Sequence, residues 1–371
     1  MRLRIVVVAA GALLLALALR HSARRPHADP PAAPEVVFMN KASRSVLLRQ
    51  ASLAPPPATV PTAASEPPSA SATNWLQRLL ANDGKVTTLS REDINRWLTS
   101  ERTNAENLLA AHQAGGGWEF LMMALTNFPN DPRVLFAAIA LKDGPDAQRA
   151  RLDRFKAAAP DNALADYLSA RDHFKNSRPE QALADLLAAS GKTGFQDYTL
   201  DAMQNAEELY LQAGKSTAEA KALGAATVLL PHLALLKDVA KDMVALQGQY
   251  LAAGDAASAE HLAQMGLQLG QRLQTGEGAS FFFNQLVGIA VDRLVLGPLD
   301  TEKNYNFLGG SVSEYMAQLD ARRAAVKEDG QYLNQWMMNA SETDIISFFD
   351  RVKIYGDSGA LAWLRQRQAG Q

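Results

Sequence analysis

The histidines are the first residues of this sequence to consider for chemistry, because histidine binds metal ions and transfers protons near neutral pH. The chain has six of them: His21, His27, His112, His173, His232 and His261. Two histidines four residues apart on one helix can bind the same metal ion, but no two of these six have that spacing. The chain also has no cysteine, which excludes zinc–thiolate sites, iron–sulfur clusters, disulfides and thiol nucleophiles. We therefore predict no metal site, no cofactor and no catalytic residue.

Two short motifs look like parts of hydrolase active sites. Gly356-Asp357-Ser358-Gly359 has the form of the nucleophile motif of chymotrypsin-type enzymes, but it lies between predicted helices in a chain without strand-like alternation. Lys192-Thr193-Gly194 matches one element of penicillin-binding enzymes, whose active-site serine motif is missing here. We interpret both as turns, the first with Asp357 or Ser358 capping a helix.

The N-terminus has the pattern of an export signal. Residues 1–4 include two arginines, the fifteen residues 5–19 are apolar or glycine, and Arg20 follows. A helix of that length spans about 22 Å, less than the ~30 Å hydrocarbon core of a bilayer. Residues 1–20 are therefore predicted to be either a cleaved signal peptide or a retained signal anchor. We expect the bulk of the chain on the extracytoplasmic side, periplasmic after cleavage or held at the cell membrane by a single span.

Residues 21–73 are predicted to be a disordered linker rich in proline, alanine and serine. Ten of the seventeen prolines of the chain lie here. Proline lacks a backbone donor and holds the chain extended, so this composition favours a semi-rigid spacer over a packed core. For the whole chain the formal net charge is −2 and the pI about 6.3, which argues against nucleic acid as a partner because nucleic-acid binders concentrate basic residues on one face.

From residue 74 onward the sequence predicts an all-α fold. Four residue pairs have the capping-box spacing, in which two side chains satisfy each other's free backbone N–H groups at the start of a helix. They are Ser90 with Asp93, Ser216 with Glu219, Ser311 with Glu314 and Ser341 with Asp344. Residues 281–299 are strongly apolar but contain Asn284 and Asp292, so we interpret them as a buried core helix. No segment after residue 20 is expected to span a membrane.

Two turns of similar sequence indicate an internal repeat. They are Phe128-Pro129-Asn130-Asp131-Pro132 and Ala159-Pro160-Asp161-Asn162. Pro129 and Pro231 are 102 residues apart, which is three times the ~34-residue period of helix-turn-helix solenoids. The sequence therefore predicts three or four degenerate repeats between about residues 120 and 270.

The residues at fixed places within these units resemble the tetratricopeptide-repeat family. That family has small residues where its paired helices approach closely and large residues that fill the seam to the next hairpin. The unit counted from Ala163 matches at Ala170, Ala182, Leu186 and Ala189, and the unit counted from Ala240 matches at Leu246, Tyr250, Gly254, Ala259 and Gly266. The resemblance implies a right-handed superhelix of antiparallel helix hairpins over residues 120–270, with N-terminal capping helices at 74–119 and a C-terminal helical region at 271–371. An irregular α-helical domain is the alternative.

In the tetratricopeptide-repeat family, one face of the first helix of each hairpin lines a concave groove that binds an extended peptide or a helix. In the best-matching unit this face carries Leu164, Tyr167, Arg171, Phe174 and Lys175. Aromatic and basic side chains on one face would hold an acidic peptide segment through stacking and charge-assisted hydrogen bonds. A solvated amphipathic face without a partner is the alternative interpretation.

These features together predict a non-enzymatic scaffold or adaptor of the cell envelope that binds protein partners through a solenoid groove and contacts the membrane through its N-terminal segment. Two alternatives stay open. One is an enzyme, a hydrolase or transferase, whose site is assembled only in the fold, with the C-terminal region as its catalytic part. The other is a soluble cytoplasmic regulator that lacks a true export signal.

Overall fold

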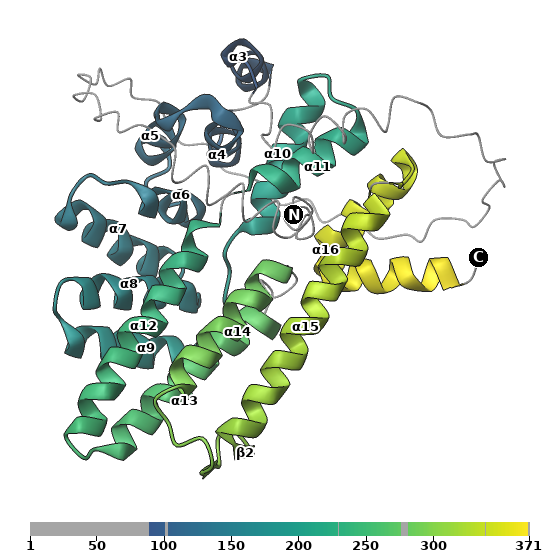
Figure 1. The fold of residues 1–371 in the computed structure, drawn as a ribbon. Coiled ribbons are helices and arrows are strands. Elements are labelled where there is room, and N and C mark those ends of the chain that lie inside the picture. The colour runs from purple at the N-terminus through teal and green to yellow at the C-terminus, as the bar shows by residue number, and fades with distance from the viewer. Residues whose placement is uncertain (1–88, 101–102, 229, 276–280, 338, 370–371) are drawn as a thin grey trace, which may run out of the picture.

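The computed structural model describes residues 89–100, 103–228, 230–275, 281–337 and 339–369. The predicted signal segment (1–20), the predicted linker (21–73) and residues 74–88 of the predicted N-terminal capping region lie outside the described residues. Within the described part the chain is helical almost throughout (Figure 1), which confirms the predicted all-α class.

In chain order the helices are α3 (Arg91–Ser100), α4 (Ala105–Ala111), α5 (Trp118–Asn127), α6 (Pro132–Ala137), α7 (Pro145–Ala158), α8 (Ala163–Lys175), α9 (Pro179–Gly191), α10 (Thr199–Gln212), α11 (Thr217–Thr227), α12 (Pro231–Ala252), α13 (Ala256–Thr275), α14 (Phe282–Leu296), α15 (Val312–Met337) and α16 (Glu342–Ala369). A π-helical turn covers His112–Gly116 and a 3-10 turn covers Ala138–Ala140. Between α14 and α15, the short strands β1 (Asn304–Tyr305) and β2 (Gly310–Ser311) pair antiparallel.

The serine cap of all four predicted capping boxes is present. At the starts of α3, α11, α15 and α16 a serine Oγ accepts a hydrogen bond from the backbone N–H three residues later. The pairs are Ser90 with Asp93 (3.1 Å), Ser216 with Glu219 (3.3 Å), Ser311 with Glu314 (3.2 Å) and Ser341 with Asp344 (3.2 Å). At α15 the reciprocal bond forms as well, because the backbone N–H of Ser311 donates to Glu314 Oε2 at 2.9 Å. These helix starts depend only on residues close in sequence, so the sequence alone predicts them.

The two similar turns adopt the same backbone conformation. Phe128 and Ala159, which end α5 and α7, have φ and ψ of −129° and 57° and of −133° and 66°. Asp131 and Asn162 then begin α6 and α8, each accepting a backbone N–H from two residues later, at 2.9 and 3.1 Å. The prediction that these segments form the same turn is confirmed.

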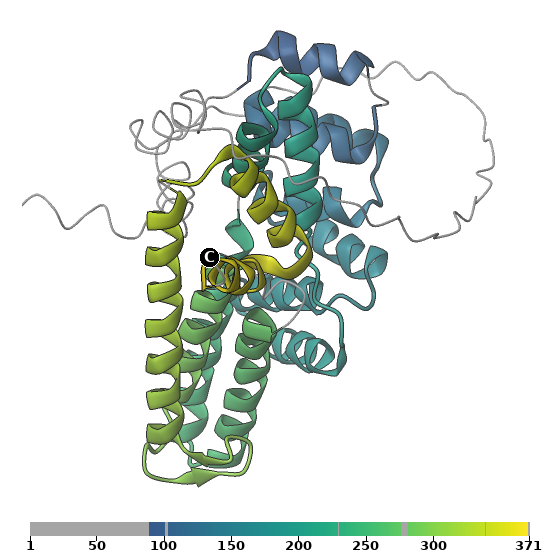
Figure 2. The same ribbon diagram turned by 90° about the vertical axis from the view of Figure 1, so that its right-hand side faces the viewer.

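Helices that follow one another along the chain pack side by side, as α8 with α9, α10 with α11 and α12 with α13. These pairs do not stack in sequence order. Helix α12 packs directly against α8, whereas α10 packs against α4 and α11 packs against α16 (Figures 1 and 2). Residues 192–198 lead the chain from α9 to α10. In a regular solenoid each repeat contacts only its neighbours in sequence, so this order departs from the regular pattern.

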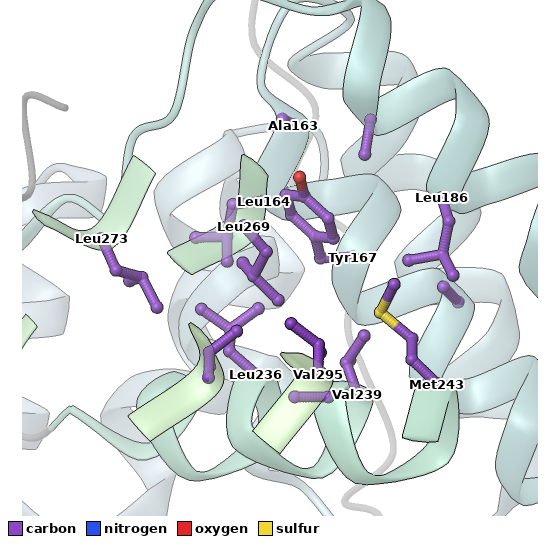
Figure 3. Close-up of a cluster of buried hydrophobic side chains, with 14 of the residues drawn as sticks. Ala163, Leu164, Tyr167, Leu186, Leu236, Val239, Met243, Leu269, Leu273 and Val295 are labelled. Atoms are coloured by element: carbon purple, nitrogen blue, oxygen red, sulfur yellow. The ribbon is translucent and has the colours of Figure 1, made fainter. Parts of the chain in front are cut away.

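The largest core lies where α8, α9, α12, α13 and α14 meet. Its labelled members in Figure 3 include Leu164 and Tyr167 of α8, Leu186 of α9, Leu236, Val239 and Met243 of α12, Leu269 and Leu273 of α13, and Val295 of α14. Ala182 and Ala259, two of the small residues that match the repeat motif, are fully buried. Small side chains at these positions allow close approach of the helices.

The segment Thr217–Ala252, described except for residue 229, is long and apolar enough to cross a membrane by length and composition, contrary to the expectation from the sequence. It contains α11 and α12, and 47% of its most apolar window is buried inside the protein. The apolar face of α12 thus packs in the core. The interpretation of residues 281–299 as a core helix is confirmed, because α14 is largely buried and includes the fully buried Asn284 and Asp292.

Arg272 of α13 links this helix to the C-terminal end of α9. Its guanidinium donates to Ala189 O (2.9 Å) in the last turn of α9, and to Lys192 O and Gly194 O (3.4 Å) in the segment that follows. Carbonyls in the last turn of a helix have no N–H partner four residues later within it, and the guanidinium satisfies part of this end of α9.

Replacing Arg272 with methionine, which keeps the length of the side chain, should lower the free energy of unfolding by about 2 kcal/mol, the usual contribution of hydrogen bonds to a charged group. Chemical denaturation of the full chain measures this change. Arg323→Met on the exposed face of α15 is the matched control and should change stability by less than ~0.5 kcal/mol. Equal effects of the two substitutions would show that Arg272 does not cap α9.

Candidate protein-binding surfaces

The predicted groove residues on α8 do not form an open groove. Leu164 is fully buried and Tyr167 is 1% exposed, both in the core that α8 forms with α12 (Figure 3). Burial raises the pKa of the Tyr167 phenol to about 12. A partner cannot reach either side chain in this arrangement, which corrects the expectation for these two residues. The cause is α12, which lies across α8 where a regular solenoid would leave a concave face.

The other three predicted groove residues lie at the edge of the same helix contact. Arg171 is half-buried and donates to Asp238 Oδ2 of α12 at 3.2 Å. Phe174 packs partly buried against the core, and Lys175 is exposed at the end of α8. The structure therefore leaves only Lys175 fully available to solvent. The aromatic and basic stripe of the sequence is for the most part an α8–α12 contact.

The histidines are distributed as single residues among different contacts. His232 is buried, and its Nε2 lies 3.3 Å from Asp197 Oδ2, which also accepts a hydrogen bond from Asn284 (3.2 Å). Burial alone would raise the pKa of Asp197. The contact with His232 and the hydrogen bond from the Thr199 N–H have the opposite effect and hold this pKa below its ordinary value. No group of three or more metal-ligating side chains occurs among the described residues.

Ser169, His173 and Asp185 gather between α8 and α9 and have the residue types of a catalytic triad. Ser169 Oγ, however, donates its hydrogen bond to Asp185, so its proton is not available to His173. Ser169 is also fully buried. A nucleophile must contact its base and reach a substrate. This cluster meets neither condition and acts as a polar contact between two helices.

The Gly356-Asp357-Ser358-Gly359 motif bends α16. Gly356 has φ 69° and ψ −178°, a conformation that favours glycine, and it divides α16 into a first arm (342–355) and a second arm (357–369) that run in different directions (Figure 1). Asp357 Oδ2 accepts the backbone N–H of Phe282 at 2.9 Å, at the start of α14. Burial raises the pKa of this carboxyl to about 6. The motif is thus a bend in α16, whereas Asp357 caps α14, which is distant in the chain, and not the helix at the motif as the sequence led us to expect.

The two arms of α16 line an open hollow of about 600 Å³. We call its lining the α16 surface: Asp350, Arg351, Ile354, Tyr355, Gly359, Ala362, Trp363 and Gln366. Ile354 is 69% exposed and Tyr355 is 63% exposed, unusually high fractions for two large apolar neighbours. Contiguous exposed apolar side chains mark sites of protein–protein contact more often than chance.

The opposite faces of both arms are fixed to the bundle. Phe348 and Val352 of the first arm and Leu361 and Leu364 of the second are buried. The α16 surface is therefore presented by two helical segments that are held in place, rather than by a free helix end.

Polar contacts reinforce this attachment. The ammonium of Lys221 on α11 lies 2.7 Å from Glu207 of α10 and 2.5 Å from Asp350 of α16, and Lys353 lies 2.8 Å from Glu207. Together these side chains link α10, α11 and the first arm of α16. A network of several charges holds its geometry better than an isolated surface pair.

Arg351 is the basic residue of the α16 surface. Its guanidinium lies over the Trp363 ring, 3.7 Å from the centroid, and donates to Ser347 O at 2.9 Å. In the described part of the chain no carboxylate lies within ion-pair distance of Arg351. A guanidinium stacked on an indole keeps donors free on its edge, which suits a carboxylate of a bound partner.

The sequence did not indicate Ile354 and Tyr355 as functional residues. The available signal was two adjacent large apolar residues directly before Gly356, because an amphipathic helix places only one of two neighbours on its buried face.

No family model, no curated protein and no solved structure matches this chain significantly. The function must therefore be inferred from the residues of the chain itself.

Proposed function

We propose that this chain is a non-enzymatic scaffold or adaptor that binds protein segments through the α16 surface. The observation that carries the proposal is the hollow between the two arms of α16, with the exposed Ile354 and Tyr355 and the indole of Trp363 in its lining. Interface hot spots are enriched in tryptophan, tyrosine and arginine placed in a partly enclosed site, and this surface has one of each.

The chemistry of the α16 surface indicates the kind of segment it binds. Its apolar lining suits one or two large apolar side chains, and Arg351 suits a carboxylate next to them. The expected partner is thus an acidic segment with an apolar anchor, the same chemistry that the α8 stripe led us to expect. We assign the binding site to α16 and not to α8 because Leu164 and Tyr167 are buried.

The architecture and location of the protein are further parts of the proposal. We infer that the paired helices between residues 120 and 270 are degenerate tetratricopeptide-like hairpins, whose right-handed superhelix is interrupted where α12 packs on α8. We also infer that residues 1–20 export the chain, so that the scaffold works on the extracytoplasmic side of the cell membrane or in the periplasm.

Photo-cross-linking in the cells that make the protein tests the proposed surface. The full chain carries a benzoylphenylalanine in place of Ile354 or, as a matched control, in place of Leu187 of α9, which is 67% exposed. The probe at 354 should give a discrete protein adduct on irradiation, and the probe at 187 should not. Arg351→Glu should reduce the yield of this adduct. Identical adduct patterns from the two probe positions would refute the α16 surface as a binding site.

A further inference from the structure

The α16 surface has features that complement one another. Ile354 and Tyr355 protrude, whereas the small residue Ala362 lines the same hollow. Both signs of charge are present as well. Arg351 needs a carboxylate, and its neighbour Asp350 is half-exposed on the same arm.

The two carboxylate oxygens of Asp350 differ in their ion pairs. Lys221 and Lys353 both approach its Oδ1, at 2.5 and 3.9 Å. Its Oδ2 has no ion-pair partner in the described part of the chain. Asp350 and Ile354 are four residues apart in a helix, so they lie on the same face and reach a partner together. One turn of this chain therefore carries the acidic residue and the apolar anchor that the α16 surface is suited to bind.

We propose that the occupant of the α16 surface is a second copy of this chain, related to the first by a two-fold axis. In a two-fold interface a surface must complement itself, so that residue i of one copy contacts residue j of the other and the reverse. Ile354 and Tyr355 of each copy enter the hollow of the other, beside Ala362. Asp350 of each copy pairs with Arg351 of the other.

This inference rests on the proposed function, because it names the partner of the same surface. A contact confined to the two arms of α16 is at the small end of specific interfaces, which usually bury more than about 1,000 Å². We therefore expect a reversible dimer with a Kd of about 1–100 μM. Since one charged pair lies at each edge of the contact, the association should weaken as salt is raised.

Sedimentation velocity of the full chain, purified as it accumulates in the cell, tests the dimer over a concentration range of about 1–200 μM, chosen to bracket the expected Kd. Wild type should shift from monomer to dimer. Ile354→Ser removes the protruding side chain and should weaken the dimer at least ~10-fold, whereas Leu187→Ser, at an equally exposed site, should leave it unchanged. Thermal unfolding of each variant confirms that it is folded.

A charge exchange provides the second measurement. Arg351→Glu places two acidic residues opposite each other in a homodimer and should abolish association. Mixing Arg351→Glu with Asp350→Arg restores both charge pairs across one interface, so the mixture should form heterodimers although neither variant forms homodimers. Failure of this rescue, with both variants folded, would overturn the proposed pairing of Asp350 with Arg351.

Two other outcomes separate this inference from the proposed function. A chain that is monomeric throughout, but gives an adduct with a different protein from the probe at 354, overturns the dimer and retains the scaffold. A chain that is monomeric and gives no adduct specific to that position overturns both. A dimer that Ile354→Ser does not weaken has its interface elsewhere and also overturns the inference.

Discussion

Gly270→Ala is expected to lower the free energy of unfolding by about 3 kcal/mol, the upper part of the range for overpacking a core. A Cβ at Gly270 would lie 1.8 Å from Asp292 Oδ1 and 3.0 Å from Gly288 O. Helices α13 and α14 therefore touch backbone to backbone at this point, and α14 must move away to admit a methyl group. Chemical denaturation of the full chain measures the loss.

Gly248→Ala is the matched control. Gly248 lies within α12 with no heavy atom near the position of a new Cβ. Alanine restricts the unfolded chain and favours helix, so this variant should gain about 0.5–1 kcal/mol. The two substitutions add the same atom to a helical glycine and should change stability in opposite directions. A gain for both would mean that α13 and α14 do not cross at Gly270.

Asp292→Asn is expected to change how stability depends on pH. Asp292 is fully buried in α14, and this burial raises the pKa of its carboxyl from 3.8 to about 7. Gln274 of α13 donates to its Oδ2 at 2.8 Å and Tyr315 of α15 at 3.3 Å, while Arg322 of α15 is the nearest cation. These three groups lower the pKa of Asp292, but burial has the larger effect.

The sign of the pH effect follows from the two pKa values of Asp292. Between pH 3.8 and about 7 the folded chain holds this proton and the unfolded chain releases it. The stability of the folded state therefore falls as pH rises through this window, and the loss is complete above pH 7. The difference between the two pKa values corresponds to about 4 kcal/mol.

Asparagine keeps the shape of the side chain without a charge. Asp292→Asn should therefore be more stable than wild type above pH 7, by up to ~4 kcal/mol, and similar to it near pH 4. Urea denaturation at several pH values measures the difference between the two chains. Asp146→Asn in the exposed first turn of α7 should give a difference that does not vary in this way. A pH-independent difference for Asp292→Asn would refute a protonated Asp292 at neutral pH.

The structural elements whose cause is local were predictable from the sequence. The capping boxes at Ser90 and Ser311 need only two residues three apart, and the turn at Phe128 recurs at Ala159 with the same backbone angles. The bend of α16 at Gly356 also has a local cause, because glycine allows the positive φ found there. In each case the energy that favours the structure comes from a few adjacent residues.

Leu164 and Tyr167 of the predicted groove are buried because their exposure depends on a distant helix. Leu164, Tyr167 and Arg171 have the spacing of a shared helix face, and the sequence places that face correctly. Whether the face meets solvent depends on what packs against it. Here α12 covers α8 in place of the intervening α10–α11 pair. No residue of α8 determines which later helix packs against it.

The sequence by itself determined the helical class, the helix starts and the repeated turn, because these depend on backbone hydrogen bonds and capping within a few residues. Only the tertiary structure decided which apolar residues stay exposed. Tyr167 and Tyr355 are both tyrosines of amphipathic helices, yet one is 1% and the other 63% exposed. The difference arises because burial is a property of the packed assembly. Helix α12 covers Tyr167, whereas the first arm of α16 packs through Phe348 and Val352 and leaves Tyr355 exposed.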